Sequence, residues 1–281
     1  MVFLFRLLGR LPLGMLPVLG ALAGWVIYLL SPTYRSHLRE NVRQAGFDDR
    51  VQRAAVGAAG KQMLELTSIL SKTQAEASAM VVEVRGWEHV EAAQRAGKGV
   101  IFLTPHLGCF EITAQYYSGF GDITVLYRAP RQAAIQQMIL DGRQRANLHL
   151  APADVSGVRA LIKALKKGQA VGMLPDQAPK VGEGVWLKFF GRWAYTMTLA
   201  GRLTETGATT LMAWGERLPG GRGYRLHIRP PLQPLAGATV DRAQQINLEI
   251  EALIRECPAQ YLWGYNRYKR PGGAEPPPEQ G

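Results

Sequence analysis

The sequence predicts an α/β fold in which a mixed, largely parallel central sheet is flanked by helices and preceded by an apolar N-terminal helix. Short apolar runs alternate along the chain with longer stretches of helical spacing, which indicates strands connected by helices. The apolar runs are nearly continuous, as in strands buried on both faces. The N-terminal helix is predicted because residues 11–34 contain no charged side chain.

The uncharged segment predicts that residues 1–34 form a membrane anchor or an interfacial helix. A hydrocarbon core of ~30 Å requires a helix of about 20 residues, and this segment is long enough. Pro12 and Pro17 disfavour a straight span and fit an interfacial or broken helix. Two alternatives remain: a secretory signal, because ALA at residues 21–23 resembles a small-residue cleavage site, and a buried helix of a soluble protein.

A second domain is expected over residues 35–271, and residues 272–281 are rich in Pro and Gly, which predicts a disordered tail. Helices dominate residues 33–80. The elements expected after them are a strand near 80–85, a helix over 88–97, a strand over 98–104, a helix over 107–120, a strand over 122–128, a helix over 132–146, a strand or loop over 149–154, a helix over 157–168, a strand and loop over 170–177, a helix over 194–207, strands over 208–218 and 223–232, and a helix over 241–257.

The charge points to an anionic partner. Lys and Arg number 33 against 22 Asp and Glu, which gives a net charge of +11. Nucleic acid, an anionic membrane surface and a phosphorylated substrate all fit such an excess, and the apolar N-terminus favours the membrane over nucleic acid. The two cysteines, Cys109 and Cys257, lack the spacing of a disulfide framework or a metal site.

The stretch TPHLGCFE places His106 and Glu111 directly after an apolar strand. Two residues five apart differ by about 140° on a helix, so we expect His106 in the loop and Glu111 in the first turn of the following helix. A carboxylate that accepts a hydrogen bond from one imidazole nitrogen fixes the tautomer and makes the other nitrogen a general base. Asp176 also follows a strand end, where open α/β sheets bind ligands. A simple capping or salt-bridge pair is the alternative for His106 and Glu111.

The H-x4-E spacing resembles the H-x4-D/E motif of acyltransferases that use acyl thioesters. Three longer blocks, residues 127–145, 168–198 and 261–271, together with the apolar N-terminus, resemble the lauroyl and myristoyl acyltransferases of lipid A biosynthesis. The resemblance covers residues 1–271. The last block, WGYNRYKRP, departs from the W-x-H-R-R-F-K form of that family, although Arg267 and Lys269 keep its basic character.

This resemblance implies a bacterial inner-membrane enzyme whose acyltransferase domain, residues 35–271, faces the cytoplasm. It would transfer a fatty acyl chain from acyl carrier protein to a hydroxyl of a Kdo-bearing lipid A precursor, an anionic glycolipid. Acyl carrier protein and the membrane are the expected partners, nucleic acid is not, and no metal or diffusible cofactor is expected. Two alternatives stay open: an O-acyltransferase of glycerophospholipids or other lipids, and a non-catalytic protein that binds anionic lipids.

Each candidate residue has an expected role. His106 is the base, Glu111 orients it, Arg143 stabilises an oxyanion or binds phosphate, and Asp176 supports the site. Cys109 is expected to be a small buried hydrophobe and Gln177 to be structural. The residues expected to bind substrate are Arg128, Arg131, Arg145, Lys188 and Arg192.

Overall fold

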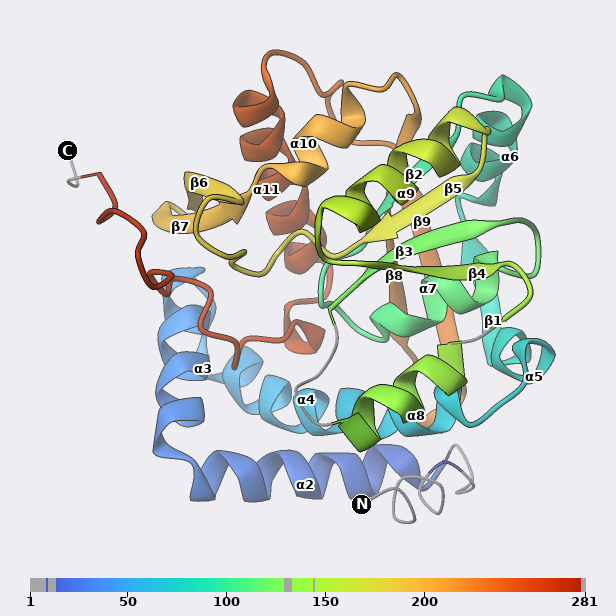
Figure 1. Ribbon diagram of the computed structural model, residues 1–281. Helices are drawn as coiled ribbons and strands as arrows, with labels where there is room; N and C mark the ends of the chain where they lie inside the picture. Colours follow the sequence, from blue (N-terminus) through green and yellow to red (C-terminus); the bar gives the residue numbers. More distant parts are fainter. Residues whose placement is uncertain (1–8, 10–13, 129–132, 144, 279–281) are drawn as a thin grey trace.

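The structure is a computed structural model that describes residue 9 and residues 14–128, 133–143 and 145–278 (Figure 1). Within these residues seven strands form one sheet in the order β1-β9-β8-β2-β5-β3-β4. Five neighbouring strands, from β8 to β4, run parallel, whereas β9 is antiparallel to β8 and parallel to β1. The predicted mixed, largely parallel sheet is therefore confirmed. The strands of this sheet are β1 Val81–Arg85, β2 Val100–Leu103, β3 Ile123–Tyr127, β4 Leu148–Pro152, β5 Ala170–Met173, β8 Thr209–Arg217 and β9 Tyr224–Arg229.

Helices cover both faces of the sheet, as the continuous apolar strands predict. Ile101 and Leu103 of β2 pack into one core together with α9, α10 and α11, whereas Val100 and Phe102 pack into a second core with α6 and α7. This alternation follows from the two-residue repeat of a strand. The described helices are α2 Leu16–Leu30, α3 Pro32–Gln44, α4 Asp49–Leu70, α5 Gln74–Ala79, α6 Trp87–Ala96, α7 Phe110–Tyr117, α8 Ala133–Arg143, α9 Val155–Lys166, α10 Leu199–Thr204 and α11 Thr239–Glu256.

A two-stranded antiparallel hairpin, β6 Gly184–Phe189 and β7 Arg192–Met197, stands apart from the main sheet. A helix is predicted from residue 194, and this prediction is wrong for residues 194–197, which belong to β7. Alternating aromatic and small residues favour a strand there, and Gly191 with φ 75° forms the turn. Helix α11 holds the hairpin in place through hydrogen bonds, since the Asn247 amide donates to Lys188 O (3.0 Å) and to Thr196 Oγ1 (3.3 Å).

The N-terminal helix α2 lies along α4 and turns sharply into α3 (Figure 1). Among the described residues, no individual helix combines the length and apolar character that a membrane crossing requires, but α2 and α3 together meet that test across a bend of 104°. One face of α2 packs against α4, because Gly20, Gly24 and Gly60 let the two backbones touch. The opposite face carries exposed Val18, Leu22, Val26, Leu29 and Leu30.

The C-terminal residues lie beside the hairpin. Trp186 Nε1 donates to Glu275 O (3.0 Å), and Ala274 is buried. These residues belong to the tail 272–281 for which the sequence predicts disorder, and its last three residues lie outside the described part of the chain. The division at residues 34 and 271 stays a prediction.

Candidate active site

His106 lies in the loop that connects β2 to α7, at the carboxyl end of the sheet. Strands β2 and β5 are neighbours, with Leu103 paired to Met173, so the loops that follow them meet. The Thr104 N–H extends this pairing by donating to Met173 O (3.0 Å). The topology thus places His106 beside Asp176, although 70 residues separate them.

Asp176 binds His106 through both carboxylate oxygens. Oδ1 lies 2.8 Å from His106 Nδ1, and Oδ2 accepts the His106 backbone N–H at 2.9 Å. The Asp176 side chain is 1% exposed and that of His106 is 16% exposed. An ionised carboxylate at Nδ1 holds the proton there, which leaves Nε2 with its lone pair.

The electrostatics of this pair keep Asp176 ionised. Burial alone would raise the pKa of Asp176, but the electrostatic attraction of the His106 ring and the hydrogen bonds from that ring and from the His106 N–H outweigh it, and the pKa lies below its ordinary value of 3.8. Tyr261 is buried next to Asp176. Burial and the Asp176 charge both raise the pKa of Tyr261 well above its ordinary value, so its hydroxyl stays protonated.

Gln177 occupies the other side of the imidazole. Its Nε2 lies 3.1 Å from His106 Nε2, so the amide donates to the nitrogen that must act as a base. The sequence predicts a structural role for Gln177 and does not predict this contact. Its position directly after Asp176, past a strand end, was the available signal.

The C-terminal segment holds the His106 loop in place. Leu262 N–H donates to His106 O and Gly108 N–H donates to Gln260 O, both at 3.0 Å. Gly108 has φ 59°, and a Cβ there would lie 2.0 Å from Gly215 O, so the loop needs glycine at this position. Arg267 is buried against the hairpin, where it donates to Tyr195 O (2.8 Å) and Thr196 Oγ1 (2.8 Å).

Glu111 does not orient His106, and that part of the prediction is wrong. Helix α7 begins at Phe110, so Glu111 lies in its first turn as expected, but its carboxylate points to Arg143 at the end of α8. Arg143 Nη2 donates to Oε2 (2.5 Å) and Nε donates to Oε1 (2.9 Å). The carboxylate thus contacts the end of α8 rather than the loop that holds His106.

The Glu111–Arg143 pair is the centre of a second polar cluster. Burial would lower the pKa of Arg143, but Glu111 raises it above its ordinary value, so the guanidinium stays charged. Gln115 donates to Glu111 (3.3 Å), and Arg145 donates to Gln115 (3.2 Å) and to Lys72 O (2.5 Å). The structure therefore separates the four predicted catalytic residues into two pairs, His106 with Asp176 and Glu111 with Arg143.

The residues expected to bind substrate do not form one cluster. Arg128 is exposed and lies 4.0 Å from Glu183, Lys188 lies over the Trp193 ring, and Arg192 pairs with Glu40 of α3. Arg145 belongs to the Glu111 cluster described above. Arg131 lies outside the described residues.

Cys109 is buried directly after the His106 loop, and burial raises its pKa well above the ordinary value. It therefore stays a neutral thiol, which agrees with the predicted role of a small buried hydrophobe. Within the described residues, no group of three His, Cys, Asp or Glu side chains is arranged to hold a metal ion.

The sequence profile of a family described as bacterial lipid A biosynthesis acyltransferase matches residues 1–270. The chain belongs to this family. The resemblance found in the sequence blocks is thus confirmed, and the acyltransferase class predicted with it agrees with the family. Individual relatives match this chain over shorter segments than the family profile does.

Three relatives illustrate this similarity. A lipid A biosynthesis lauroyltransferase of Escherichia coli (strain K12) is 29% identical over 68% of this chain and 63% of its own length. A lipid A biosynthesis acyltransferase of Haemophilus influenzae is 25% identical over 64% and 57%, and a lipid A biosynthesis myristoyltransferase of Escherichia coli (strain K12) is 26% identical over 69% and 62%. The matched segments therefore span less than two thirds of these relatives.

Proposed function

We propose that the protein transfers a fatty acyl chain from a carrier-protein thioester to a hydroxyl of a lipid A precursor. The observation that carries this proposal is the His106–Asp176 pair at the carboxyl end of the sheet, in a chain of the lipid A acyltransferase family. The names of the relatives support the acceptor class. A Kdo-bearing acceptor and acyl carrier protein as donor remain part of the proposal.

The reaction needs no covalent enzyme intermediate. His106 Nε2 takes the proton of the acceptor hydroxyl while its oxygen attacks the thioester carbonyl carbon. The tetrahedral intermediate expels the thiolate, which receives that proton from the imidazolium, so the products are an ester and a free thiol. Asp176 stabilises the imidazolium through Nδ1.

The acceptor hydroxyl must replace the Gln177 amide at His106 Nε2 before the proton moves. Arg143 uses Nε and Nη2 to bind Glu111, and among the described residues its Nη1 has no hydrogen-bond partner. We assign to Nη1 the stabilisation of a substrate oxyanion or phosphate, for which a guanidinium is suited.

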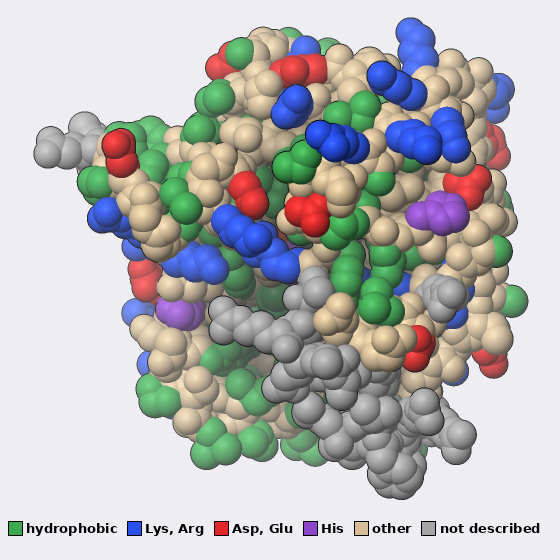
Figure 2. Space-filling model, viewed as in Figure 1, with side chains coloured by type: hydrophobic (Ala, Val, Ile, Leu, Met, Phe, Trp, Pro, Cys, Tyr) green, Lys and Arg blue, Asp and Glu red, His purple; other side chains and the backbone are tan. Residues whose placement is uncertain are grey.

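The bacterial inner membrane, at its cytoplasmic face, is the proposed location. The exposed apolar face of α2 supports contact with lipid, and the net charge of +11 supports attraction to an anionic surface. Figure 2 shows hydrophobic side chains at the lower left edge of the molecule, where part of α2 lies.

The test is incubation of the purified protein with a lipid A precursor and acyl carrier protein charged with chains of several lengths, read by mass spectrometry. An added acyl chain on the precursor is expected. His106→Ala should lower the rate by at least about 100-fold while circular dichroism and thermal unfolding stay close to wild type. Acylation of glycerophospholipids alone, with the lipid A precursor unchanged, would reject the proposed acceptor.

A further inference from the structure

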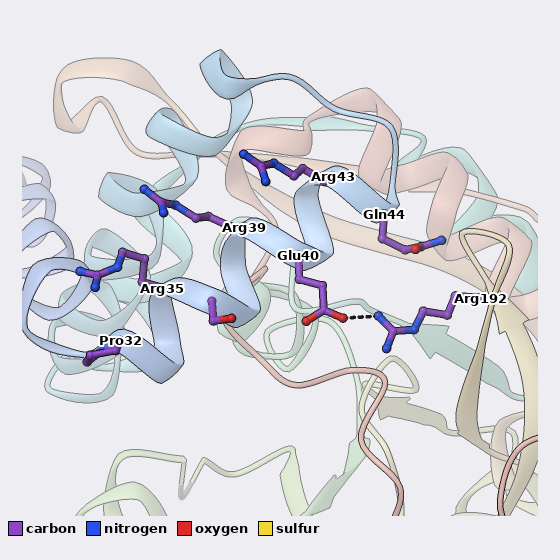
Figure 3. Close-up of a pocket in the computed structure, with 8 residues that line it drawn as sticks. Pro32, Arg35, Arg39, Glu40, Arg43, Gln44 and Arg192 are labelled. Atoms are coloured by element: carbon purple, nitrogen blue, oxygen red, sulfur yellow. Dashed lines mark hydrogen bonds and ion pairs between the residues drawn. The ribbon is translucent and has the colours of Figure 1, made fainter.

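A second hollow lies along the outside of α3 and shares no residue with the site around His106. It has a volume of about 620 Å³ and contains four arginines and one carboxylate (Figure 3). Its lining residues are Pro32, Arg35, Ser36, Arg39, Glu40, Arg43, Gln44 and Arg192.

Three of the arginines form a row on α3. Arg35, Arg39 and Arg43 are four residues apart, so successive side chains lie on one helix face with a rise of about 6 Å between them. Figure 3 shows the three guanidinium groups extending from the same side of the helix. Glu40 points instead to Arg192 of the hairpin, with which it forms an ion pair.

This row carries uncompensated positive charge. None of the ion pairs found among the described residues involves Arg35, Arg39 or Arg43. Like charges on one turn repel each other by a few tenths of a kcal/mol per pair, so the helix gains nothing from the row by itself. An anion in the hollow would remove that repulsion.

Two of the arginines are already held in position. Arg35 Nη1 donates to Leu29 O (3.1 Å) and Tyr28 O (3.3 Å) at the end of α2, and Arg39 Nε donates to Tyr28 Oη (2.8 Å). These bonds use Nη1 of Arg35 and Nε of Arg39. The Nη1 and Nη2 groups of Arg39 and the whole guanidinium of Arg43 have no hydrogen-bond partner among the described residues. Guanidinium groups with free donors suit phosphate oxygens.

The surface next to the row is apolar. Leu29 and Leu30, at the end of α2, are 62% and 78% exposed, and the arginine row begins five residues later. Because α3 leaves α2 at 104°, the row rises away from the apolar face of α2 (Figure 1). A bilayer has the same order, with hydrocarbon first and a layer of headgroups and their phosphates above it.

From this we propose that the α3 hollow binds the phosphate group of an anionic lipid in the membrane on which α2 rests. Arg39 and Arg43 contact the phosphate oxygens, and Arg35 fixes the junction of the two helices. The inference rests on the proposed membrane location, but vesicle binding requires no acyl transfer, so it is tested independently of the reaction. A lipid is favoured over an acidic protein because the row continues the exposed apolar face of α2.

The test is flotation of the full chain with vesicles of phosphatidylcholine, either pure or containing about 30 mol% phosphatidylglycerol. Arg43→Gln should weaken partitioning to the anionic vesicles about fivefold, and Arg39→Gln/Arg43→Gln about 25-fold, with no change on the neutral vesicles. Arg39→Lys/Arg43→Lys keeps the charge but loses the bidentate geometry, and we expect an intermediate loss.

A matched control lies on α9, where Arg159 and Lys163 are exposed and also four residues apart, on the opposite side of the molecule from α2 (Figure 1). Arg159→Gln/Lys163→Gln removes the same charge and should change partitioning less than twofold. An equal loss in this control, or wild-type partitioning of the α3 double variant, would overturn the proposal. It would also be overturned if the α3 variants kept vesicle binding and lost binding of an acidic carrier protein.

Discussion

At the scale of single residues, the chemistry depends on which carboxylate meets the His106 imidazole. Asp176 binds Nδ1 and the backbone N–H of His106, whereas Glu111 binds Arg143. Asp176→Asn would favour the wrong tautomer, because an amide nitrogen at Nδ1 donates rather than accepts. We expect acyl transfer to fall by about 10²–10⁴-fold with little change in KM. Steady-state kinetics of a folded variant would check this, and near-normal turnover would contradict the assignment.

The same pair predicts a pH-dependent contribution to stability. The pKa of Asp176 in the folded state lies below its ordinary value of 3.8. The ionised carboxylate therefore stabilises the fold fully at pH values above the pKa of the unfolded state, and this stabilisation is lost as the pH falls through the pKa of the folded state. The difference in the free energy of unfolding between wild type and Asp176→Asn should thus be constant near neutral pH and shrink in acid. Urea denaturation over that pH range measures it. If this difference in the free energy of unfolding grew as the pH fell, it would contradict the prediction.

Gln177 offers a second test of the base. A carboxylate placed 3.1 Å from His106 Nε2 by Gln177→Glu would stabilise the imidazolium, which cannot accept a proton. The acidic limb of the pH–rate profile should shift to higher pH by about one pH unit or more. Gln177→Asn and Gln177→Ala lack the charge and should leave the limb in place. An unshifted limb in Gln177→Glu would show that Nε2 is not the titrating base.

The sequence predicts the place of His106 in the fold but not its partner. An apolar strand followed by a polar loop marked His106 and Asp176 separately as residues at strand ends. That these strands are neighbours, with Leu103 opposite Met173, depends on the order of strands in the sheet. Spacing along the chain favours Glu111 instead. That side chain pairs with Arg143, and the position of Arg143 depends on how α8 packs, which the spacing does not show.

At the scale of elements, Glu111 and Arg143 join the start of α7 to the end of α8. Their side chains are 7% and 17% exposed, so each is costly to leave unpaired. Glu111→Gln should lower the free energy of unfolding by about 2–4 kcal/mol, because Arg143 keeps a buried charge without its partner. Chemical denaturation measures the loss. We expect Glu111→Gln to lose less turnover than Asp176→Asn. A larger loss of turnover in Glu111→Gln would indicate that Glu111, not Asp176, orients His106.

The contact between α2 and α4 is predicted to depend on particular glycines. A Cβ on Gly60 would lie 2.0 Å from Gly20 O, so Gly60→Ala must push α2 away, at a cost of about 1–3 kcal/mol. Gly57, one turn earlier, is the control. A Cβ there meets Ala21 Cβ at 3.5 Å, so Gly57→Ala should be neutral or stabilise α4 by up to about 1 kcal/mol. Thermal unfolding and proteolysis near residue 31 would compare the two variants.

The N-terminal segment shows what composition alone could and could not predict. The run without charge correctly predicted an apolar helix, which α2 confirms. The glycines that attach α2 to α4 were visible in the sequence, but only the packing shows that they face each other. The β6–β7 hairpin was missed for a related reason, because its strands pair with each other and pack on α11 rather than joining the main sheet.

At the scale of the whole molecule, the apolar face of α2 and the arginines of α3 contribute different forces to membrane binding. Burial of apolar side chains is insensitive to salt, whereas attraction between charges is screened. Leu22→Gln/Leu29→Gln should therefore weaken partitioning to neutral and anionic vesicles alike, by about tenfold for each leucine. Leu248→Gln on α11, where the leucine is 55% exposed, is the control and should leave partitioning unchanged.

Salt separates the two contributions. If α2 rests on hydrocarbon, Leu22→Gln/Leu29→Gln weakens vesicle partitioning in high salt as much as in low salt. The weaker partitioning of Arg39→Gln/Arg43→Gln relative to wild type disappears in high salt, because screening removes the charge attraction from the wild-type protein as well. The two sets of substitutions should then add, because Arg39 and Arg43 make no hydrogen bond to Leu22 or Leu29. Leucine variants that bind both kinds of vesicle like wild type would place the membrane-facing surface of this protein elsewhere.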